Sequence, residues 1–227
     1  MARKTKNMQA KKTIYVFWEG ESEEVYSIYL RRTFSDRAGI QIHREKGTFA
    51  TARAYYRGNV KFHGDVEELD EIWFFFDTEI EKADQWEENF KCLKDIIASR
   101  KRKHPIRIRL LMTSCCIEYW FLLHYERIAP AMAMPADKDR ILKTVQSYNP
   151  SYDKGNYEAT ANIAQKYDIA IKNGRWTLER LKSDGMPERT EEENKESDEW
   201  LFKGTHTFTT VHEAVEMLLE LPKLKKY

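Results

Sequence analysis

Short runs of β-branched and aromatic side chains recur along this chain and predict its strands. The runs TIYVFW (13–18) and EIWFFF (71–76) show little polar alternation, which is typical of strands buried on both faces of a parallel sheet. A third run, IRIRLLM (106–112), predicts another strand, and GIQIHRE from Gly39 predicts a shorter one.

Segments with apolar residues at helical spacing separate these runs. They cover residues 22–34, 48–58, 81–103 and 116–125. The resulting β-α-β-α-β-α-β-α order predicts an α/β fold with a mostly parallel central sheet, right-handed crossovers and helices on both faces.

The pattern changes near residue 130, where helical spacing continues without obvious strands. We therefore expect a basic disordered tail at 1–12, an α/β core at 13–128, and a mainly helical C-terminal region at 129–227 packed on that core. The acidic, apolar-poor segment 184–199 predicts a mobile loop. A last helix is expected at 209–221.

Two residue types mark where helices are expected to begin. Ser22 is a plausible N-cap for the first helix and Thr209 for the last, because short hydroxyl side chains accept hydrogen bonds from free backbone N–H groups. Glu23 and Glu24 suit the positive end of the first helix dipole.

Charge and hydropathy narrow the classes of function. Net charge is only +1 over 227 residues, so nucleic-acid contacts must come from local basic patches, of which RKRKHPIRIR (100–109) is a candidate. Apolar runs fall short of the ~18 residues that a membrane-spanning helix needs. No signal-peptide pattern follows the basic N-terminus, so we expect a cytoplasmic protein without membrane contacts.

Several common site motifs do not occur in the sequence. Cys92, Cys115 and Cys116 form no C-x-x-C pair, which argues against a zinc knuckle and a disulfide framework. The sequence has no G-x-x-x-x-G-K-[ST], G-x-S-x-G or H-E-x-x-H motif. An ATP-driven system would need a separate ATPase chain.

Acidic residues follow two of the predicted strands directly. Glu19 ends the first run, and Asp77 and Glu79 end the run at 71–76. Ligands of parallel α/β sheets collect beyond the carboxyl ends of the strands, so these three carboxylates are candidate ligands for Mg²⁺ or Mn²⁺. Gly20 would let the chain turn and a phosphate approach. The plain alternative is that these acids cap the next helix or face water.

The same residues carry a resemblance to known families. E-G behind one strand and acid-x-acid behind another resemble the Toprim domain of topoisomerases, primases and OLD-type nucleases. The blocks VFWEGESEEVYSIYL, IWFFFDTE and SCCIEYWFLLHY resemble more specifically the RloB-like family, whose blocks read E-G-x-x-[ST]-E, D-x-D and S-N-P-x-F-E-L-W-L-L-L-H in this order. The resemblance covers residues 12–126 and continues weakly through YDKGNY (152–157) and HTFTTVHEAVEMLL (206–219).

The resemblance implies a Toprim-like metallonuclease that acts in bacterial phage defence beside an AAA-type ATPase partner and attacks RNA, tRNA included, or DNA. It implies that Glu19 is a metal ligand or general acid/base, that Asp77 and Glu79 are metal ligands, and that Glu118 is a further acid of the site. Lys154 matches a family lysine able to contact the scissile phosphate. Toprim nucleases often dimerise, so the C-terminal helices are a candidate surface for a homodimer.

Two departures from the family pattern keep a second hypothesis open. Glu79 stands where the family has aspartate, and SCCIEYW lacks the proline of S-N-P. The alternative is therefore a catalytically weak or inactive binding or regulatory subunit of a defence ATPase complex. A nucleotidyl or phosphoryl transferase would use the same metal chemistry.

Overall fold

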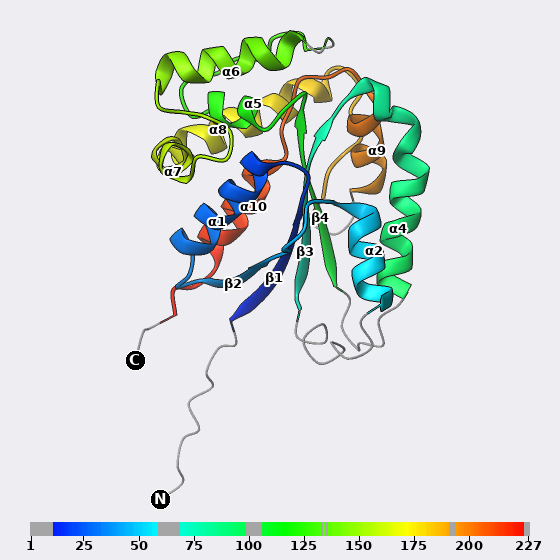
Figure 1. Cartoon of the computed structure of the whole chain (residues 1–227). Coiled ribbons are helices and arrows are strands. Elements are labelled where there is room, and N and C mark those ends of the chain that lie inside the picture. Colours follow the sequence, from blue (N-terminus) through cyan, green and yellow to red (C-terminus); the bar gives the residue numbers. More distant parts are fainter. Residues whose placement is uncertain are drawn as a thin grey trace, which may run out of the picture.

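A four-stranded parallel sheet forms the centre of the computed structural model, which describes residues 11–58, 69–98, 106–132, 134, 136–190 and 194–224. The strand order is β2-β1-β3-β4 (Figure 1). The strands are β1 (Lys12–Trp18), β2 (Ala38–Ile42), β3 (Glu71–Thr78) and β4 (Arg107–Ser114). Every pairing is parallel, so the predicted fold class is confirmed.

The two central strands bury side chains on both faces of the sheet, as their apolar runs predict. Along β3, Trp73 and Phe75 join one core cluster, while Phe74 and Phe76 join the other. All four are at most 3% exposed. Successive residues of a strand point to opposite faces, so the aromatic run supplies both cores at once.

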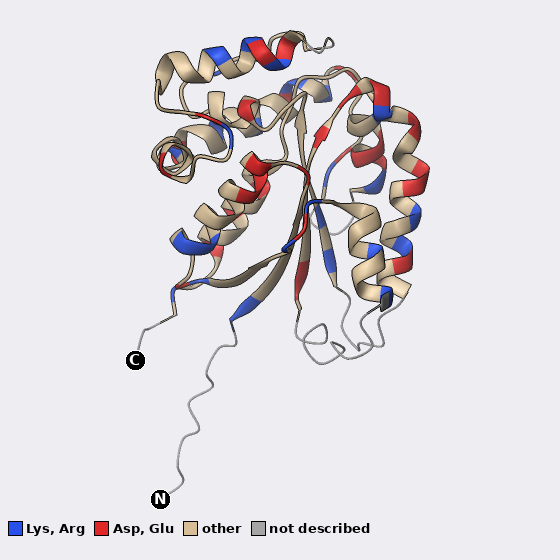
Figure 2. Ribbon diagram, viewed as in Figure 1, with Lys and Arg blue, Asp and Glu red and all other residues tan. Residues whose placement is uncertain are grey.

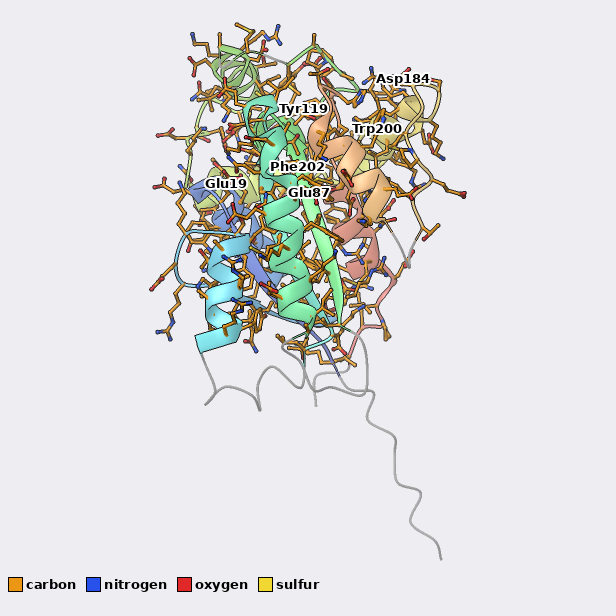
Figure 3. The ribbon with its side chains drawn as sticks, turned by 90° about the vertical axis from the view of Figure 1, so that its right-hand side faces the viewer. Glu19, Glu87, Tyr119, Asp184, Trp200 and Phe202 are labelled. Atoms are coloured by element: carbon orange, nitrogen blue, oxygen red, sulfur yellow. The ribbon has the colours of Figure 1, made fainter. Side chains whose placement is uncertain are left out.

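Helices cover both faces of the sheet (Figure 1). One face carries α1 (Glu21–Thr33) and α10 (Val211–Glu220). The other carries α2 (Phe49–Gly58), α4 (Trp86–Ala98) and α9 (Lys195–Lys203). Figure 3 shows α4 between α2 and α9, with Phe202 labelled where α9 meets α4. There the ring of Phe202 packs against Trp86, with 5.3 Å between centroids.

Five further helices lie beyond the carboxyl ends of the strands (Figure 1). They are α5 (Glu118–Leu122), α6 (Ala136–Tyr148), α7 (Tyr157–Ala164), α8 (Tyr167–Glu179) and the short 3₁₀ helix η3 (Arg180–Lys182). The C-terminal part is thus helical, as predicted, and it encloses the sheet end where the acids were expected. Among the described helices, none has the length and apolar character needed to cross a bilayer.

Two expected segments differ in the structure. The second half of the acidic segment is not a loop, because α9 begins at Lys195. Its buried Asp198 accepts a hydrogen bond from Arg189 at 2.5 Å, a pairing that composition alone does not show. The helix expected at 81–103 begins instead as the 3₁₀ helix η2 (Ile80–Gln85), and α4 follows it. Residues 1–10, 99–105 and 191–193 lie outside the described residues.

The expected N-caps are both displaced. Gly20 occupies the N-cap position of α1, and Ser22 lies inside its first turn. Thr210, not Thr209, is the N-cap residue of α10. Thr210 also donates its backbone N–H to the carbonyl of Met112 at 2.9 Å, so this segment covers part of the outer edge of β4 and satisfies its free hydrogen-bonding groups.

Candidate functional site

The ends of β1 and β3 bring the first two predicted acids together. Glu19 follows β1, and its backbone N–H donates to the carbonyl of Phe75 in β3 at 3.1 Å. The Oε2 atom of Glu19 then accepts a hydrogen bond from the backbone N–H of Asp77 at 3.2 Å. Because β1 and β3 are parallel neighbours, residues 58 positions apart share one end of the sheet, as predicted from the pattern.

A third acid, Glu23, enters from the first turn of α1. The sequence indicated only an acid that complements the helix dipole, but the residue is 4% exposed and points inward. Its carboxylate lies over Gly20, where an added Cβ atom would stand 2.7 Å from Glu23 Oε2. A larger residue at position 20 would therefore displace the Glu23 carboxylate, although the backbone φ of −136° is open to any residue. In the sequence, the only sign that Glu23 joins Glu19 in the site is its spacing of four residues from it.

Glu118 completes what we call the carboxylate cluster: Glu19, Glu23, Asp77 and Glu118. Glu118 is the first residue of α5 and only 1% exposed, so it is not the surface residue that a helix acid often is. Its Oε1 atom accepts hydrogen bonds from Ser22 Oγ and from Tyr152 OH, each at 2.9 Å. Figure 2 shows the acidic starts of α1 and α5 near the acidic carboxyl end of β3.

The loop before α7 closes over this cluster. Lys154 Nζ lies 3.7 Å from Glu118 Oε2, while half of the lysine side chain remains exposed. Gly155 has φ +75°, and an added Cβ atom would lie 3.2 Å from Glu21 Oε2. The structure thus places Lys154 next to Glu118. In the sequence, only the resemblance to the RloB-like family had assigned both residues to one site. Tyr152, beside them, was not expected in the site.

Burial and mutual repulsion dominate the electrostatics of the cluster. Burial, together with the nearby charges of Glu118 and Glu19, raises the pKa of Glu23 from 4.5 to about 7. Burial and the charges of Glu23 and Glu19 raise the pKa of Asp77 well above its ordinary value. Asp77 Oδ1 is buried without a hydrogen-bond partner. Such a carboxylate requires either a proton or a nearby cation, because burying its negative charge without a partner raises the free energy of the folded state.

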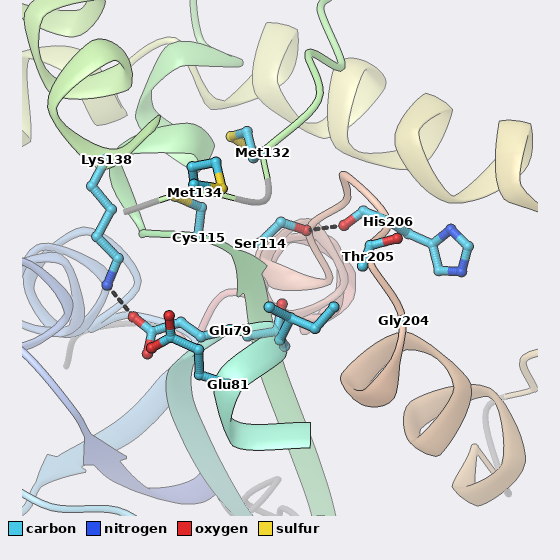
Figure 4. Close-up of a pocket in the computed structure, with 12 residues that line it drawn as sticks. Glu79, Glu81, Ser114, Cys115, Met132, Met134, Lys138, Gly204, Thr205 and His206 are labelled. Atoms are coloured by element: carbon cyan, nitrogen blue, oxygen red, sulfur yellow. Dashed lines mark hydrogen bonds and ion pairs between the residues drawn. The ribbon is translucent and has the colours of Figure 1, made fainter. Parts of the chain in front are cut away.

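Glu79 is held outside this cluster by two lysines. Lys138 of α6 pairs with its Oε1 atom (Figure 4), and Lys82 of η2 lies 3.0 Å from its Oε2 atom. Burial alone would raise the pKa of Glu79, but hydrogen bonds from Lys138 and Lys82 bring it below the ordinary value. Lys82 also lies 2.7 Å from Glu19 Oε1. Lys82 therefore bridges Glu19 and Glu79. The role of Glu79 as a metal ligand stays a prediction.

The donor chemistry of the cluster fits Mg²⁺ or Mn²⁺, although no closed cage exists. Its donors are carboxylate oxygens, which hard divalent cations prefer, and the unpartnered Asp77 Oδ1 is an open position. Within the described part of the chain, no three His, Cys, Asp or Glu side chains are already placed to hold one ion. Mg²⁺ usually keeps several waters and uses one or two carboxylates plus substrate phosphates, so an incomplete protein shell is compatible with it.

The basic segment and the cysteines were also singled out in the sequence. Arg109, from the basic segment 100–109, is buried against Glu71 at the opposite end of β3, with 3.2 Å between Nε and Oε2. Residues 100–105 lie outside the described residues. Cys92, Cys115 and Cys116 are buried free thiols, and the hydrogen bond with Cys115, burial and the charges of Glu118 and Asp77 together raise the pKa of Cys116.

The comparisons with known proteins support the resemblance found in the sequence. The chain matches the family described as RloB-like protein over residues 14–218, a range that includes all four acids of the cluster, Glu79 and Lys154. No curated protein and no solved structure matches the chain. On the strength of the family match, this chain belongs to the RloB-like proteins.

Proposed function

We propose that this protein is a metal-dependent nuclease that hydrolyses phosphodiester bonds of RNA or DNA. The single observation that carries the proposal is the carboxylate cluster, in which Glu23 and Glu118 are buried and Asp77 Oδ1 has no hydrogen-bond partner. A structural role would not require several acids to repel one another at the carboxyl end of a parallel sheet, where α/β proteins bind ligands.

The roles follow from the placement of each residue. Asp77 and Glu19 would hold Mg²⁺ or Mn²⁺, and such an ion supplies positive charge to the phosphoryl transition state and acidifies water. Glu23, with a pKa of about 7, can accept or return a proton near neutral pH, where general acid–base catalysis is most efficient. Ser22 and Tyr152 hold Glu118 in a fixed orientation.

Lysines at the border of the cluster would contact the nucleic acid. Lys154 is half exposed beside Glu118, and Lys82 is about one-third exposed beside Glu19. Their ammonium groups can neutralise backbone phosphates without a strongly basic chain overall. Within this proposal the protein is the effector of an anti-phage defence system, and an AAA-type ATPase partner controls its activity.

The test is cleavage by the purified protein, alone and with a candidate ATPase partner. Labelled RNA, including tRNA, and labelled DNA are incubated with Mg²⁺ or Mn²⁺ and, separately, with EDTA. We expect cutting that requires metal and that Glu19→Gln and Asp77→Asn each abolish. Glu87→Gln is the matched control, because this acid of α4 is 77% exposed and pairs with Lys203 of α9. Cutting that persists in EDTA or in both site variants would refute the proposal.

The lysine bridge supports a second candidate function. With Lys82 on both Glu19 and Glu79, the site already holds positive charge, and a domain of this kind could serve as an inactive binding or regulatory subunit. Titration calorimetry with Mn²⁺ separates the two functions. The regulatory function predicts no binding at millimolar metal together with a stable complex with the ATPase, whereas the nuclease function predicts binding that Asp77→Asn removes.

A further inference from the structure

A pocket of about 180 Å³ lies beside the carboxylate cluster, between the ends of β3 and β4 and the segment that follows α9 (Figure 4). Its apolar walls include Ile80, Met132 and Met134. Its charged and polar groups include Lys138, Glu79, Glu81, Thr205 and His206. The nuclease proposal assigns this space no role.

Two of the apolar residues that line the pocket are exposed to solvent. Ile80 is 50% exposed and Met134 is 67% exposed, and both belong to the small set of large apolar side chains exposed in the described residues. Water contact with such side chains is unfavourable, so apolar residues that gather around a cavity indicate a surface that is covered by a ligand. Methionine suits this purpose because its flexible, polarisable thioether adapts to flat ring systems.

The opposite wall presents groups that can read hydrogen-bonding edges. The ring of His206 stacks on Trp200 with 3.8 Å between centroids and 11° between planes. Ser114 Oγ donates to the carbonyl of His206 at 2.7 Å and fixes this segment (Figure 4). Burial lowers the pKa of His206, so its imidazole is neutral at pH 7 and offers one donor and one acceptor. Thr205 adds an exposed hydroxyl group.

A chain of ion pairs connects the pocket with the cluster. Lys138, on the pocket wall, pairs with Glu79; Glu79 pairs with Lys82; and Lys82 pairs with Glu19. Lys138 is the ammonium group that lines the pocket, and it lies beside Glu79 and Glu81 (Figure 4). A flat ring in the pocket would place an attached phosphate outside it, towards Lys138 and Lys82, which link the pocket to the cluster.

We infer that this pocket binds one unstacked nucleobase of the strand whose phosphate lies at the carboxylate cluster. The inference rests on the proposed nucleic-acid substrate and adds how that substrate is seated. The volume suits a single ring system and not a helix or a strand of a protein partner. Single-stranded nucleic acids are commonly held in this way, with bases against apolar or aromatic side chains and the backbone beside cations.

The test is equilibrium binding of a short labelled single strand, measured by fluorescence anisotropy in EDTA so that no strand is cut. The intact strand is compared with an abasic strand of the same length and charge. We expect the wild type to bind the intact strand at least about fivefold more tightly, because base contacts of this kind contribute on the order of a kcal/mol or more. Thr205→Phe fills the pocket from an exposed position, and it should remove this difference.

Ser147→Phe is the matched control, since Ser147 is an exposed hydroxyl residue of α6 outside the pocket; it should leave the difference intact. Equal binding of intact and abasic strands by the wild type would overturn the inference, and so would a base preference that survives Thr205→Phe. Failure of the nuclease proposal has a different signature, because base-dependent binding without any metal-dependent cutting would leave the pocket assignment in place.

Discussion

Glu19 Oε2 accepts a hydrogen bond from the backbone N–H of Asp77 at 3.2 Å, across two neighbouring parallel strands. This contact fixes the Glu19 carboxylate relative to the end of β3 without any bound ion. Its other oxygen faces Lys82 at 2.7 Å. The acid that ends the first strand is thus oriented by both the backbone of the sheet and a replaceable cation, an arrangement that allows a divalent ion to compete with the lysine.

The raised pKa of Glu23 predicts a specific dependence of stability on pH. The folded state retains the proton up to about pH 7, whereas an ordinary glutamate loses it near 4.5. Folded protein therefore binds more protons between these two values, and its free energy of unfolding falls as pH rises through this window. The loss amounts to at most about 3.5 kcal/mol, since each pH unit of the window is worth roughly 1.4 kcal/mol.

Glu23→Gln should remove this contribution, because the neutral amide needs no proton. In metal-free buffer, denaturant unfolding at pH 4 should show little difference between variant and wild type attributable to this charge. At pH 8 the variant should be more stable, by about 1–3 kcal/mol. Glu87→Gln, at an exposed site, should show no such divergence. A difference between Glu23→Gln and wild type that stays constant from pH 4 to pH 8 contradicts the assignment.

Divalent metal should stabilise the protein through Asp77. At pH 8, Mn²⁺ at 100 times its dissociation constant would add about 2.7 kcal/mol, and about 1 kcal/mol shifts the Tm of a chain of this size by about 2–4 °C. We expect a thermal shift of several degrees in the wild type and none in Asp77→Asn. The metal-free Asp77→Asn protein should melt above the metal-free wild type, because Asp77 is held in a site that disfavours its charge.

The two side chains that reach Glu118 from the loop before α7 should differ in their effects. Tyr152→Phe removes a buried hydrogen bond of 2.9 Å and should lower the free energy of unfolding by about 1–3 kcal/mol. Lys154→Ala removes a half-exposed ion pair and should cost less than about 1 kcal/mol. If Lys154 contacts the substrate, its variant loses nuclease rate out of proportion to stability. Equal stability losses in urea unfolding would show that the two contacts are equivalent.

The fold could be predicted because its signals are local. Runs such as EIWFFF can be satisfied only by a strand with apolar surroundings on both faces, and Trp73 to Phe76 divide between the two cores as this requires. The prediction of a loop in the second half of segment 184–199 was wrong because the helix there depends on contacts between residues distant along the chain. There the charged Asp198 is buried because Arg189, nine positions away, neutralises it. Such a pairing produces no hydrophobic periodicity in the sequence.

The site could be predicted only where strand ends define it. Glu19 and Asp77 were placed together by the rule that parallel strands end at one edge, and the structure places them so. Glu23 and Tyr152 were not expected there, because their roles depend on the direction of a helix start and of a loop. Ser22, which looked like a helix cap, instead bonds Glu118, 96 positions later in the sequence.

Gly20 offers the sharpest test that the position of Glu23 matters. Alanine is allowed by the backbone at this position, where φ is −136°, but its Cβ atom would stand 2.7 Å from Glu23 Oε2. Gly20→Ala should therefore displace that carboxylate while circular dichroism remains unchanged. Misplacing a catalytic group by about 1 Å can cost on the order of 100-fold in rate, so we expect nuclease activity to fall about 10–100-fold.

Gly39→Ala is the matched control for Gly20→Ala. The Cβ atom added at Gly39 would lie 3.9 Å from its nearest neighbouring atom, so this variant should cut at the wild-type rate. Equal rates for the two glycine variants would mean that Glu23 can leave its place over Gly20 without consequence, and its role as the proton-carrying acid would have to be abandoned.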